Sequence, residues 1–426
     1  MARYSPRLIY IVLDGAGDTP GKGETSLEAA ETPNLDYIAS RSKAGLVYVL
    51  GMGVAPQSDA ATMSLLGYSP YEYRVGRGVL EALGLGVKIR PGYELALRGN
   101  LATVDDDDTI VDRRCGRDVA DKESGELLAG LEYVELGRYG GYAKVYPSKG
   151  HRVAVVIGSR MYRLDPHISN IDPAYKRVGY ISEAVQNPGN KVLKCEPLRD
   201  SGGARIAAEL VNIFYELSRE YLKNHPINSL RREGGRLPCN AILLRDAGDR
   251  PENIPMFPHK FGFKMASVVE MPVERGIAEL IGLVIADIPD VKFASERYMK
   301  MAERAVEILE FTDAVYIHIK GADEPAHDGD REGKVKALEM IDKYFVGSLL
   351  ESIDMDNTAI LVTCDHATPP DLKSHSADPV PIYIYRPGYR SDGIDRFSEN
   401  LASGGSLGLI TGGWDIIPLV KRMVWG

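Results

Sequence analysis

The sequence predicts an α/β fold in which a doubly wound sheet of buried strands is split by a smaller, inserted α+β domain. Continuous apolar runs near the start of the chain and in its last third have the character of buried parallel strands. Amphipathic segments separate the later runs, and strands that alternate with helices indicate a doubly wound sheet. The middle of the chain lacks this alternation and is rich in glycine and arginine. With 426 residues, the chain is long enough for two or three domains.

The elements of the main domain follow from local signals. The first strand is expected at Leu8–Leu13, an apolar run that ends in Asp14 and Gly15. Thr32 and Pro33 should begin a helix, because threonine is a favourable N-cap and proline fits the first helical position. Four more buried strands are expected at Lys264–Met271, Ala314–Ile319, Thr358–Thr363 and Pro381–Tyr385. Apolar residues at helical spacing predict a helix over Glu332–Ser352, namely Val335, Leu338, Ile341, Phe345 and Leu349.

The inserted domain is predicted at residues 80–255, so residues 1–79 and 256–426 would form the discontinuous main domain. Short alternating segments predict strands in the insert at Tyr93–Val104, Ile110–Arg114 and His151–Ile157. Two hinges would join the insert to the main domain. One would be formed by the glycines between positions 76 and 86, and the other by the prolines of the segment 251–258. The acidic run Asp105–Asp108 is expected at a solvated hairpin tip, because adjacent like charges repel one another.

Composition narrows the classes of partner. A net charge of −9 argues against binding to nucleic acid or to an anionic membrane surface. The four cysteines have no paired spacing, so they suggest neither a disulfide framework nor a thiolate zinc site, and their scarcity favours a reducing cytoplasm. No signal-peptide pattern and no apolar run of about 18 residues is present. The chain contains only two glutamines among many charged residues, which is typical of a thermophilic source.

Carboxylates and imidazoles gather in one short stretch of the chain. The stretch between positions 323 and 375 contains two aspartates and three histidines, in a protein with eight histidines. They are Asp323, His327, Asp365, His366 and His375. Mixed oxygen and nitrogen ligands suit Zn²⁺, Mn²⁺ or Fe²⁺, and this set is larger than one metal ion requires. Paired cations about 4 Å apart stabilise the attacking and leaving oxygens of a phosphoryl group. The stretch therefore predicts phosphoryl transfer at a two-metal site.

Each of these residues also has a simpler interpretation. Asp14 could be a turn aspartate before glycine, and Asp323 and His327 could form an exposed pair one helical turn apart. Asp365 and His366 could end a strand with their hydrogen bonds satisfied inside the protein, and a lone histidine such as His375 is usually structural. The metal hypothesis rests on their convergence at the carboxyl ends of strands, where ligands of open α/β sheets bind.

Ser58 is the candidate nucleophile. It follows a loop rich in glycine and proline, at or just before the start of a helix. The simpler interpretation is a helix N-cap, a position that favours serine in its own right. A helix N-terminus also favours an anion, and a bound cation would favour the serine alkoxide. The two roles are compatible.

The insert supplies basic residues for an anionic substrate. Guanidinium groups bind carboxylate and phosphate oxygens in pairs. Any single arginine is more commonly a surface residue than a ligand, but the segment Val111–Arg117 holds three of them. The candidates in and just after the insert are Arg98, Asp112, Arg113, Arg114, Arg117, His151, Arg152, Arg245 and Lys264.

These motifs resemble the alkaline-phosphatase superfamily of two-metal phosphotransferases and, more closely, the archaeal type of cofactor-independent phosphoglycerate mutase. The resemblance spans essentially the whole chain. It rests on Val12-Leu-Asp14-Gly15, Thr32-Pro-Asn-Leu-Asp36, Ala55-Pro-Gln-Ser58-Asp, Ser64-Leu-Leu-Gly-Tyr68, Arg98-Gly-Asn-Leu-Ala-Thr103, Val111-Asp-Arg-Arg114, Asp323-Glu-Pro-Ala-His-Asp328, Asp365-His366 and His375-Ser-Ala-Asp-Pro-Val-Pro381.

The resemblance implies an alkaline-phosphatase-like sheet and a set of residue roles. One metal ion would be held by Asp323, His327 and His375, and the second by Asp14, Asp365 and His366, with Ser58 as a further metal ligand between the two. Ser58 would take the phosphate from 3-phosphoglycerate and return it to the 2-hydroxyl, without 2,3-bisphosphoglycerate. Five residues of the insert would bind glycerate and assist proton transfer, namely Asp112, Arg113, His151, Arg152 and Arg245. Lys264 would contact the phosphate. Mn²⁺ is the expected metal, with Zn²⁺, Mg²⁺ or Co²⁺ as alternatives, and a homo-oligomer is compatible with the sequence.

Two other functions remain open at this stage. The first is a phosphatase, phosphodiesterase or phosphopentomutase of the same superfamily, and the second is a non-catalytic, metal-binding regulatory protein. A hydrolase lets water reach the phosphoserine, whereas a mutase must shield it. One departure from the family pattern bears on the substrate residues, because Arg245 is followed by Asp246 where glycine is expected.

Overall fold

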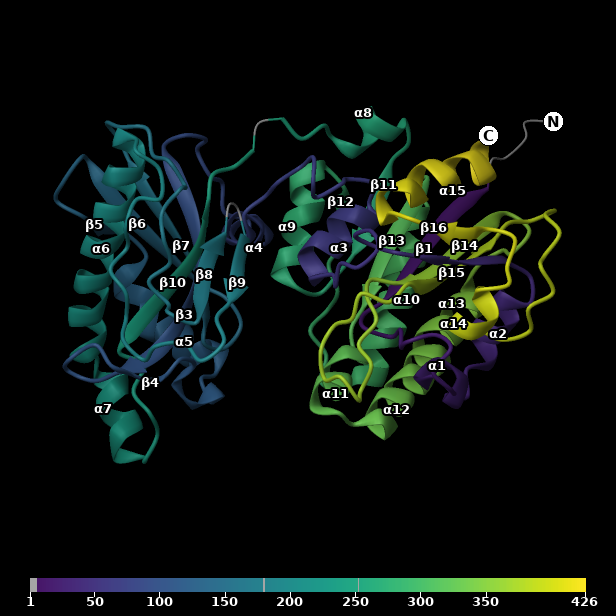
Figure 1. Cartoon of the computed structure of the whole chain (residues 1–426), viewed down its shortest axis with the longest axis horizontal. Helices are drawn as coiled ribbons and strands as arrows, with labels where there is room; N and C mark the ends of the chain where they lie inside the picture. The colour runs from purple at the N-terminus through teal and green to yellow at the C-terminus, as the bar shows by residue number, and fades with distance from the viewer. Residues whose placement is uncertain (1–5, 179–180, 252) are drawn as a thin grey trace. The chain divides into compact units, whose positions relative to one another are not determined.

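The computed structural model describes residues 6–178, 181–251 and 253–426. The chain divides into two compact units (Figure 1). Unit 1 comprises the residues up to Tyr73 together with Pro255–Gly426, and unit 2 comprises Arg74–Ile254. Unit 2 is thus continuous in sequence and interrupts unit 1.

Unit 1 is built on an eight-stranded sheet with the order β12-β11-β13-β1-β14-β15-β2-β16. The strands from β12 to β14 are parallel, and β15 runs antiparallel to both of its neighbours. The strands are β1 (Arg7–Leu13), β2 (Lys43–Val47), β11 (Met265–Val268), β12 (Val284–Ile285), β13 (Ala314–Ile319), β14 (Thr358–Cys364), β15 (Val380–Tyr385) and β16 (Gly408–Ile410). The five buried strands expected from apolar runs are confirmed, and the mainly parallel α/β sheet is the predicted fold class.

The helices of unit 1 occupy most of the connections between these strands. They are α1 (Ser26–Ala29), α2 (Pro33–Ala39), α3 (Ser58–Leu65), α8 (Phe257–Phe261), α9 (Pro272–Ile281), α10 (Ala294–Leu309), α11 (Asp323–Asp328), α12 (Arg331–Ile341), α13 (Gly347–Ser352), α14 (Glu399–Ala402) and α15 (Ile416–Trp425). The helix predicted over Glu332–Ser352 is present as α12 and α13, joined by a π-helical turn at Asp342–Val346. The expected N-cap Thr32 precedes α2, but its side chain makes no capping hydrogen bond.

Unit 2 is an α+β structure around a largely antiparallel sheet with the order β10-β3-β7-β6-β5, and β4 pairs with β3. Its strands are β3 (Glu94–Val104), β4 (Ile110–Asp112), β5 (Val134–Glu135), β6 (Gly141–Pro147), β7 (Arg152–Ser159) and β10 (Ala241–Gly248), and β8 (Tyr175–Val178) pairs with β9 (Ile181–Ala184). Its helices are α4 (Arg77–Gly84), α5 (Asp121–Leu128), α6 (Gly202–Lys223) and α7 (Pro226–Glu233), with short 3₁₀ turns at Cys115–Arg117 and Ala129–Leu131.

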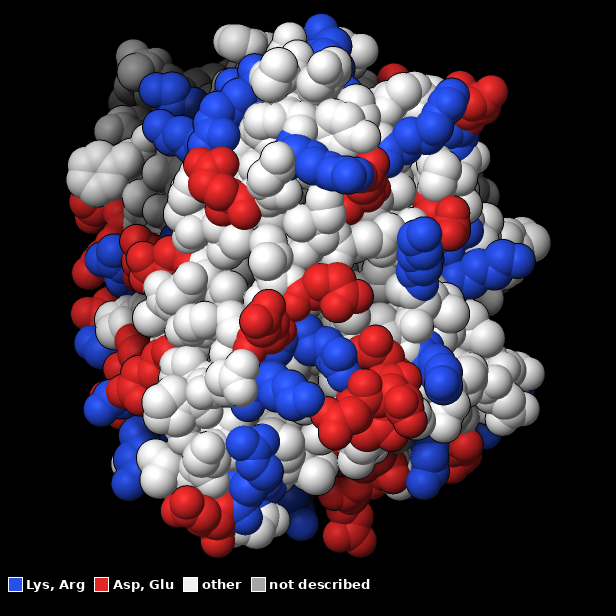
Figure 2. All heavy atoms as spheres, turned by 90° about the vertical axis from the view of Figure 1, so that its left-hand side faces the viewer, with Lys and Arg blue, Asp and Glu red and all other residues white. Residues whose placement is uncertain are grey.

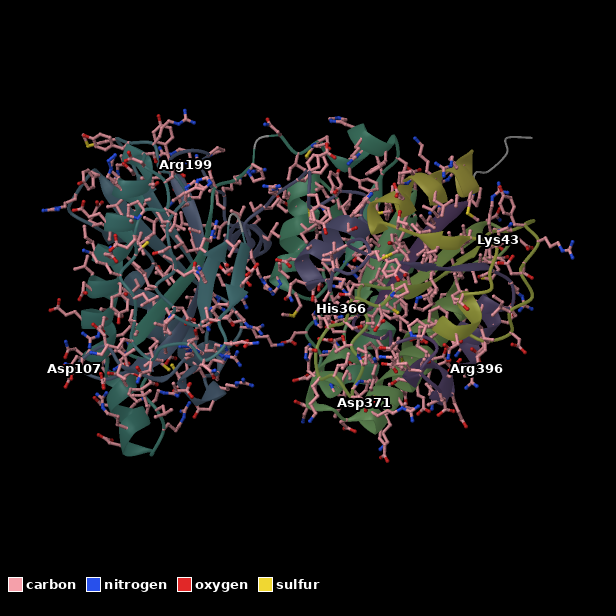
Figure 3. All side chains as sticks on the ribbon, viewed as in Figure 1. Lys43, Asp107, Arg199, His366, Asp371 and Arg396 are labelled. Carbon is pink, nitrogen blue, oxygen red and sulfur yellow. The ribbon has the colours of Figure 1, made fainter. Side chains whose placement is uncertain are left out.

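The acidic run lies at the turn between β3 and β4, as predicted for a solvated hairpin tip, and Asp107 points outward there (Figure 3). Helix α6 supplies opposite charge to this turn. Lys223 lies 2.6 Å from Asp106, and Arg219 lies 3.0 Å from Asp108. The face of unit 2 in Figure 2 carries acidic and basic side chains next to one another, with no extended patch of a single sign.

Within the ranges that the structure describes, none of the helices has the length and apolar character needed to cross a membrane.

A buried lysine connects two loops at the carboxyl ends of the central strands. The side chain of Lys334 in α12 is fully buried, and its ammonium donates to the Gly17 carbonyl at 2.9 Å, to Asp18 Oδ1 at 2.7 Å and to the Thr368 carbonyl at 3.0 Å. Gly17 and Asp18 follow β1, whereas Thr368 follows β14. All three donor hydrogens of the ammonium are therefore used to fix these loops relative to each other.

Substitution of Lys334 tests this connection. We expect Lys334→Met to lower the free energy of unfolding by about 3–5 kcal/mol, because it leaves Asp18 buried without its cation. Lys336→Met is the matched control on the same helix, since Lys336 is 72% exposed and lies 3.9 Å from Glu332. The control substitution should change the free energy of unfolding by no more than about 0.5 kcal/mol. Urea unfolding of both variants measures the difference, and equal stabilities would contradict the role of Lys334.

Candidate metal centre

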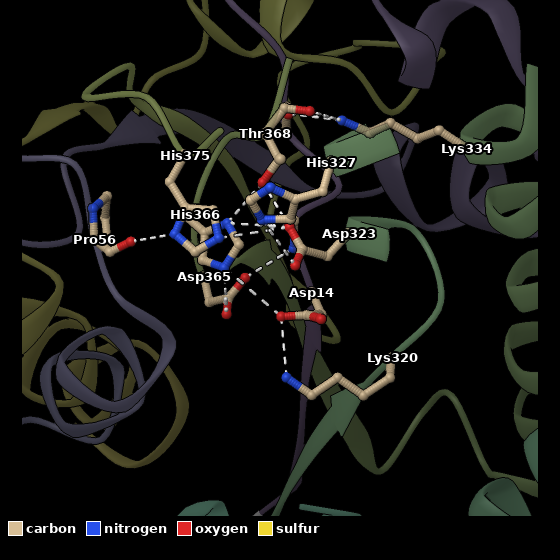
Figure 4. Close-up of polar contacts among 12 residues, drawn as sticks. Asp14, Pro56, Lys320, Asp323, His327, Lys334, Asp365, His366, Thr368 and His375 are labelled. Atoms are coloured by element: carbon tan, nitrogen blue, oxygen red, sulfur yellow. Dashed lines mark hydrogen bonds and ion pairs between the residues drawn. The ribbon is translucent and has the colours of Figure 1, made fainter. Parts of the chain in front are cut away.

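The candidate ligands converge at the carboxyl ends of three adjacent strands in unit 1 (Figure 4). Asp14 follows β1, Asp323 begins α11 just after β13, and Asp365 and His366 follow β14. Because the three strands are parallel neighbours, their carboxyl ends meet at one edge of the sheet. His366 lies inside unit 1 (Figure 3) and is completely buried. The structure brings these predicted residues together at one end of the sheet.

The first group contains Asp323, His327 and His375, whose ligand atoms all lie within 4.8 Å of one another. Asp323 and His327 lie one turn apart on α11, with His327 Nε2 3.5 Å from the carboxylate. His375 comes from the loop before β15, and its Nε2 lies 3.7 Å from Asp323 Oδ1. This is the set that the sequence predicted for one metal ion.

The sequence predicted Asp14, Asp365 and His366 for the second metal ion. In the structure, Asp14 and His366 group with Asp323, and Asp14 and Asp365 group with His318. His366 Nε2 lies 3.2 Å from Asp365 Oδ2 and 3.7 Å from Asp14 Oδ1. The chain leaves the β14 strand after Cys364, so the side chains of Asp365 and His366 can face the same point despite being neighbours. The other oxygen of Asp365 accepts a hydrogen bond from the Gly15 amide at 3.0 Å.

Hydrogen bonds at Nδ1 orient all three imidazole rings. His327 Nδ1 donates to the Lys373 carbonyl at 3.0 Å, and His375 Nδ1 donates to the Pro56 carbonyl at 2.6 Å. The Thr368 hydroxyl donates to Asp323 Oδ1 at 2.8 Å, so it must accept the hydrogen of His366 Nδ1 at 2.9 Å. Each ring therefore directs the lone pair of Nε2 toward the carboxylates, as metal-binding histidines do.

This arrangement fits divalent cations. Within the described residues, Asp365 Oδ2 and His366 Nε2 are buried and take part in no hydrogen bond, and Asp14 Oδ1 has only an ion pair with the Lys320 ammonium at 3.0 Å. Lone pairs of oxygen and nitrogen that face each other at 3.2 Å are unfavourable unless a cation lies between them. Carboxylate and imidazole ligands suit Zn²⁺ or Mn²⁺. That the six residues hold two metal ions stays a prediction, now with a physical basis.

The charges of the cluster shift several pKa values. Burial raises the pKa of Asp323, but the nearby His375 and His366 rings and the Thr368 hydroxyl lower it to about 2. Burial likewise acts upward on Asp365, and the facing His366 and His318 rings bring its pKa well below the usual range. Both carboxylates are therefore ionised at neutral pH, as a metal ligand requires.

Ser58 is the first residue of α3, and Gln57 occupies the N-cap position without a side-chain hydrogen bond. Ser58 is therefore not the N-cap that the simpler interpretation suggested. Its loop is tied to the metal centre, because Pro56, two residues earlier, accepts the hydrogen bond of His375. The serine hydroxyl thus lies at a helix N-terminus, where the helix dipole favours an anion.

Three further residues of the centre were missed by sequence reasoning. His318 lies in β13 with its Nε2 3.3 Å from Asp365 Oδ2, and Lys320 directly follows that strand with its ammonium 3.0 Å from Asp14 Oδ1. Glu274 in α9 is buried and lies 2.7 Å from the Lys320 ammonium. A histidine and a lysine at the end of an otherwise apolar strand were a usable signal for the first two. The sequence around Glu274 contains no such signal, because only tertiary packing brings α9 to this edge of the sheet.

The structure does not bring Lys264 to this centre. Lys264 immediately precedes β11, and its amide donates to Asp313, which precedes β13. It therefore lies at the amino ends of the parallel strands, on the opposite edge of the sheet. The lysine that lies at the carboxyl ends of these strands, next to the candidate metal ligands, is Lys320.

Three of the predicted arginines, together with Asp112, line a cavity in unit 2. A cavity of about 400 Å³ is lined by Asp112, Arg113, Arg114, Arg117 and the turn at residues 188–190. Asp112 Oδ1 accepts from the backbone amides of Arg114 at 2.7 Å and Gly116 at 3.0 Å, which shapes this loop. The carboxylate therefore has a structural role that the sequence did not reveal.

Arg245 is buried nearby in unit 2. Asp172 links it to the loop, since its carboxylate lies 3.4 Å from Arg245 Nη1 and 3.6 Å from Arg113 Nη1. The Arg245 guanidinium also lies over the Tyr175 ring at 4.4 Å. The unexpected Asp246 has a left-handed backbone with φ of 59°, at a bulge where β10 shifts register against β3. Aspartate tolerates this conformation better than most residues, so it can replace the expected glycine.

His151 precedes β7 and Arg152 begins it, so the two are neighbours at the start of this strand. Burial lowers the pKa of His151, and the charges of Arg152, Arg114, Arg117 and Arg245 lower it further, to about 4. His151 is neutral at pH 7, in surroundings that favour an anion.

Comparison with known proteins gives consistent matches. Residues 39–228 match the family model described as 2,3-bisphosphoglycerate-independent phosphoglycerate mutase. A protein of that name from Aeropyrum pernix is 44% identical over 99% of this chain and all of its own length, and one from Archaeoglobus fulgidus is 38% identical over 95% of both. A cofactor-independent phosphoglycerate mutase of known structure from Thermoplasma acidophilum is 34% identical, with a TM-score of 0.67 over 98% of this chain and all of that one. A solved protein from Pyrococcus horikoshii gives a TM-score of 0.78 at 28% identity, over 99% of this chain and 97% of its own.

Gly15 offers a test of how the centre is assembled. Its φ is 61°, and a Cβ atom there would lie 2.6 Å from Asp323 Cβ. Gly15→Ala should displace Asp323 and weaken metal binding about 10–100-fold, as expected when the support of a ligand is disturbed. Gly21→Ala is the control for backbone strain alone, because Gly21 has φ of 77° and no atom within 4 Å of an added Cβ. Titration with Zn²⁺ measures the metal affinity of both variants. Equal affinities would contradict the idea that an added Cβ at Gly15 displaces Asp323.

Proposed function

Since the chain belongs to the 2,3-bisphosphoglycerate-independent phosphoglycerate mutase family, we propose that it interconverts 3-phosphoglycerate and 2-phosphoglycerate through a phosphoserine at Ser58. The observation that carries the proposal is the full-length identity of 44% combined with a complete set of candidate ligands at one sheet edge. The enzyme is then an isomerase of glycolysis and gluconeogenesis, and it needs no bisphosphoglycerate.

Two divalent cations are proposed as the cofactors, one with Asp323, His327 and His375 and the other with Asp14, Asp365 and His366. When bound, they would neutralise the charge that develops on the phosphoryl oxygens and favour the Ser58 alkoxide. The residue geometry supports this assignment because the Nε2 lone pairs and carboxylate oxygens face one another in both groups. Mn²⁺ and Zn²⁺ both suit these ligands.

Ser58 is proposed as the nucleophile. Its oxygen would form a bond to phosphorus while the bond from phosphorus to the 3-oxygen of the substrate breaks, and a proton is delivered to that oxygen. In the second half-reaction the 2-hydroxyl loses its proton and takes the phosphate from Ser58. The N-terminus of α3 favours negative charge at this point of the chain.

Lys320 is proposed to contact the transferring phosphate, in the role that the sequence assigned to Lys264. Its ammonium lies 3.0 Å from Asp14 and its side chain is 22% exposed, so it borders the centre without being enclosed by it. Glu274 at 2.7 Å holds the other side of the ammonium.

Unit 2 is proposed to bind the glycerate part of the substrate. Arg113, Arg152 and Arg245 would hold its carboxylate, since guanidinium groups pair with carboxylates in a bidentate manner. His151 and Asp112 would exchange protons with the glycerate hydroxyls. His151 suits this role because it is neutral at pH 7 and can accept a proton.

Retention of glycerate separates a mutase from the alternative hydrolases. A phosphatase or phosphodiesterase has no need to hold the alcohol that leaves, whereas a mutase must keep it in place for the second transfer. The arginines that line the cavity of unit 2 would supply that capacity, which favours the mutase. The reaction is proposed to take place in the cytoplasm, with free glycerate phosphates as the only small-molecule partners and a homo-oligomer as a compatible assembly.

The first test is a coupled assay. We expect the metal-loaded protein to produce 2-phosphoglycerate from 3-phosphoglycerate without bisphosphoglycerate, followed through enolase. EDTA should abolish the reaction and Mn²⁺ should restore it, because the carboxylates need cations to carry out the transfer. Release of inorganic phosphate without 2-phosphoglycerate would identify a hydrolase and refute the mutase.

The second test is removal of the nucleophile. Ser58→Ala should lower kcat at least about 10⁴-fold, as expected when a covalent mechanism loses its nucleophile. Its metal content should change little, because the six other ligands remain. Ser40→Ala is the control, since the Ser40 hydroxyl bonds only locally, to the Tyr37 carbonyl and the Arg41 side chain. Substantial turnover by the Ser58 variant would rule out the phosphoserine.

A further inference from the structure

We propose that Asn100 is a specificity-determining residue of the substrate site in unit 2, and that its side-chain amide binds the free hydroxyl of phosphoglycerate. The inference rests on the proposed function and deepens it. The residues proposed above hold the carboxylate and move protons, whereas Asn100 adds a neutral group that recognises the hydroxyl. Three features carry the inference, namely the position of Asn100 in the sheet, its unused hydrogen-bonding capacity and the charges beside it.

Asn100 lies in β3, on the polar face of the unit 2 sheet (Figure 1). Successive side chains of a strand point to opposite faces of its sheet. Leu97 and Leu101 belong to the apolar core of unit 2 and so mark the apolar face of β3. Arg98 follows Leu97, and Asn100 precedes Leu101. Both of these polar side chains therefore leave the sheet on its other face.

Strand pairing brings two more arginines to this polar face. Arg152 in β7 is the Cα partner of Asn100, and Arg245 in β10 is the Cα partner of Arg98. The Cβ atoms of such partners lie about 5 Å apart. The partner of Arg98 in β7 is Ala154, which has no polar side-chain atom. The polar groups at these paired positions are therefore three guanidinium groups and the amide of Asn100.

The amide of Asn100 has no partner in the protein. Asn100 is 5% exposed, yet within the described residues its side chain takes part in no hydrogen bond. Neither of its amide atoms is sealed from solvent, so the group remains accessible to a ligand. A side-chain amide donates and accepts hydrogen bonds, and so does a hydroxyl. The free amide can therefore pair with a ligand hydroxyl in both directions.

A purely structural role does not explain this amide. Two other buried asparagines of the described chain, Asn170 and Asn228, show what such a role requires. Asn170 makes three side-chain hydrogen bonds within unit 2. Asn228 also makes three. Buried polar groups are normally satisfied in this way, so the unused amide of Asn100 indicates a ligand.

The charges beside Asn100 favour a ligand that is an anion. Arg152, its direct neighbour in β7, forms no ion pair or hydrogen bond within the described residues. Arg98 shares the Glu81 carboxylate with Arg77. The same oxygen of Glu81 lies 2.9 Å from Arg98 Nε and 3.5 Å from Arg77 Nε. Because one carboxylate serves two cations here, a carboxylate of the ligand can complete the pairing.

The chemistry of the substrate connects the amide with these charges. In 3-phosphoglycerate the free hydroxyl is on the carbon next to the carboxylate. A carboxylate bound by Arg152 would bring that hydroxyl toward Asn100, because the two residues are paired across β3 and β7. A ligand with the carboxylate but without the hydroxyl would leave the amide unpaired, and a site built for a hydroxyl rejects such a ligand.

Calorimetric titration of the metal-loaded Ser58→Ala protein tests the assignment, because this variant should bind substrate without turning it over. The two ligands are 3-phosphoglycerate and 3-phosphooxypropionate, which lacks only the 2-hydroxyl. We expect 3-phosphoglycerate to bind roughly 10–100-fold more tightly. Adding Asn100→Leu should bring this ratio to about 1, through weaker binding of 3-phosphoglycerate and little change for the analogue. Equal weakening of both ligands in a folded Asn100→Leu protein would indicate a structural role and overturn the proposal.

Asn224→Leu in the same Ser58→Ala protein is the matched control. Asn224 is exposed, and its amide donates only to the Glu220 carbonyl, at 3.1 Å. The control should keep the full preference for 3-phosphoglycerate. Equal affinity for the two ligands in protein that retains Asn100 would also overturn the proposal, and this measurement requires no Asn100 variant to fold. Because binding is measured without turnover, failure of hydroxyl recognition is distinct from failure of the coupled mutase assay.

Discussion

The structure depends on a concentration of buried negative charge at one edge of the unit 1 sheet. Asp14, Asp323 and Asp365 meet there because β1, β13 and β14 are adjacent and parallel, so their carboxyl ends coincide. Such charges are expensive to bury unless cations accompany them. The Lys320 ammonium and the imidazole rings meet only part of this requirement. The remainder defines the divalent-cation sites and, with them, the chemistry of the protein.

His327 and His375 are each oriented by a backbone carbonyl from a distant part of the chain, and His366 is oriented by the hydroxyl of Thr368, two residues further on. Thr368 receives the hydrogen of His366 and passes its own to Asp323, which joins the ligands of the two sites. The Thr368 carbonyl is held in turn by the buried Lys334. His375 binds the carbonyl of Pro56, so the loop that carries Ser58 is connected to a metal ligand. The proposed metal ligands and the proposed nucleophile are thereby coupled through short, direct contacts.

Much of this centre could be predicted from the sequence, and the limits have physical causes. Five of the candidate ligands either follow an apolar run or share a helical turn, namely Asp14, Asp323, His327, Asp365 and His366. Such patterns are local, so the sequence alone reveals them. His318 was overlooked because it lies within a strand, where a single polar residue does not break an apolar pattern. Short strands such as β2 and β16 were missed because their formation depends on neighbouring strands, and Asp246 had a role that only its left-handed backbone explains. Lys264 was assigned to the site although it immediately precedes its strand, and the amino ends of the parallel strands lie away from the carboxyl ends where the candidate ligands meet.

The most direct measurement is rapid acid quenching of the metal-loaded protein during turnover, followed by peptide mass spectrometry. Phosphate should be found on Ser58 after mixing with either 3-phosphoglycerate or 2-phosphoglycerate. It should be absent when the protein has been freed of divalent cations, because the charged edge of the sheet then cannot accept the phosphoryl group. Turnover without phosphate on Ser58, or phosphorylation of Ser58 in the absence of cations, would contradict a cation-dependent covalent transfer.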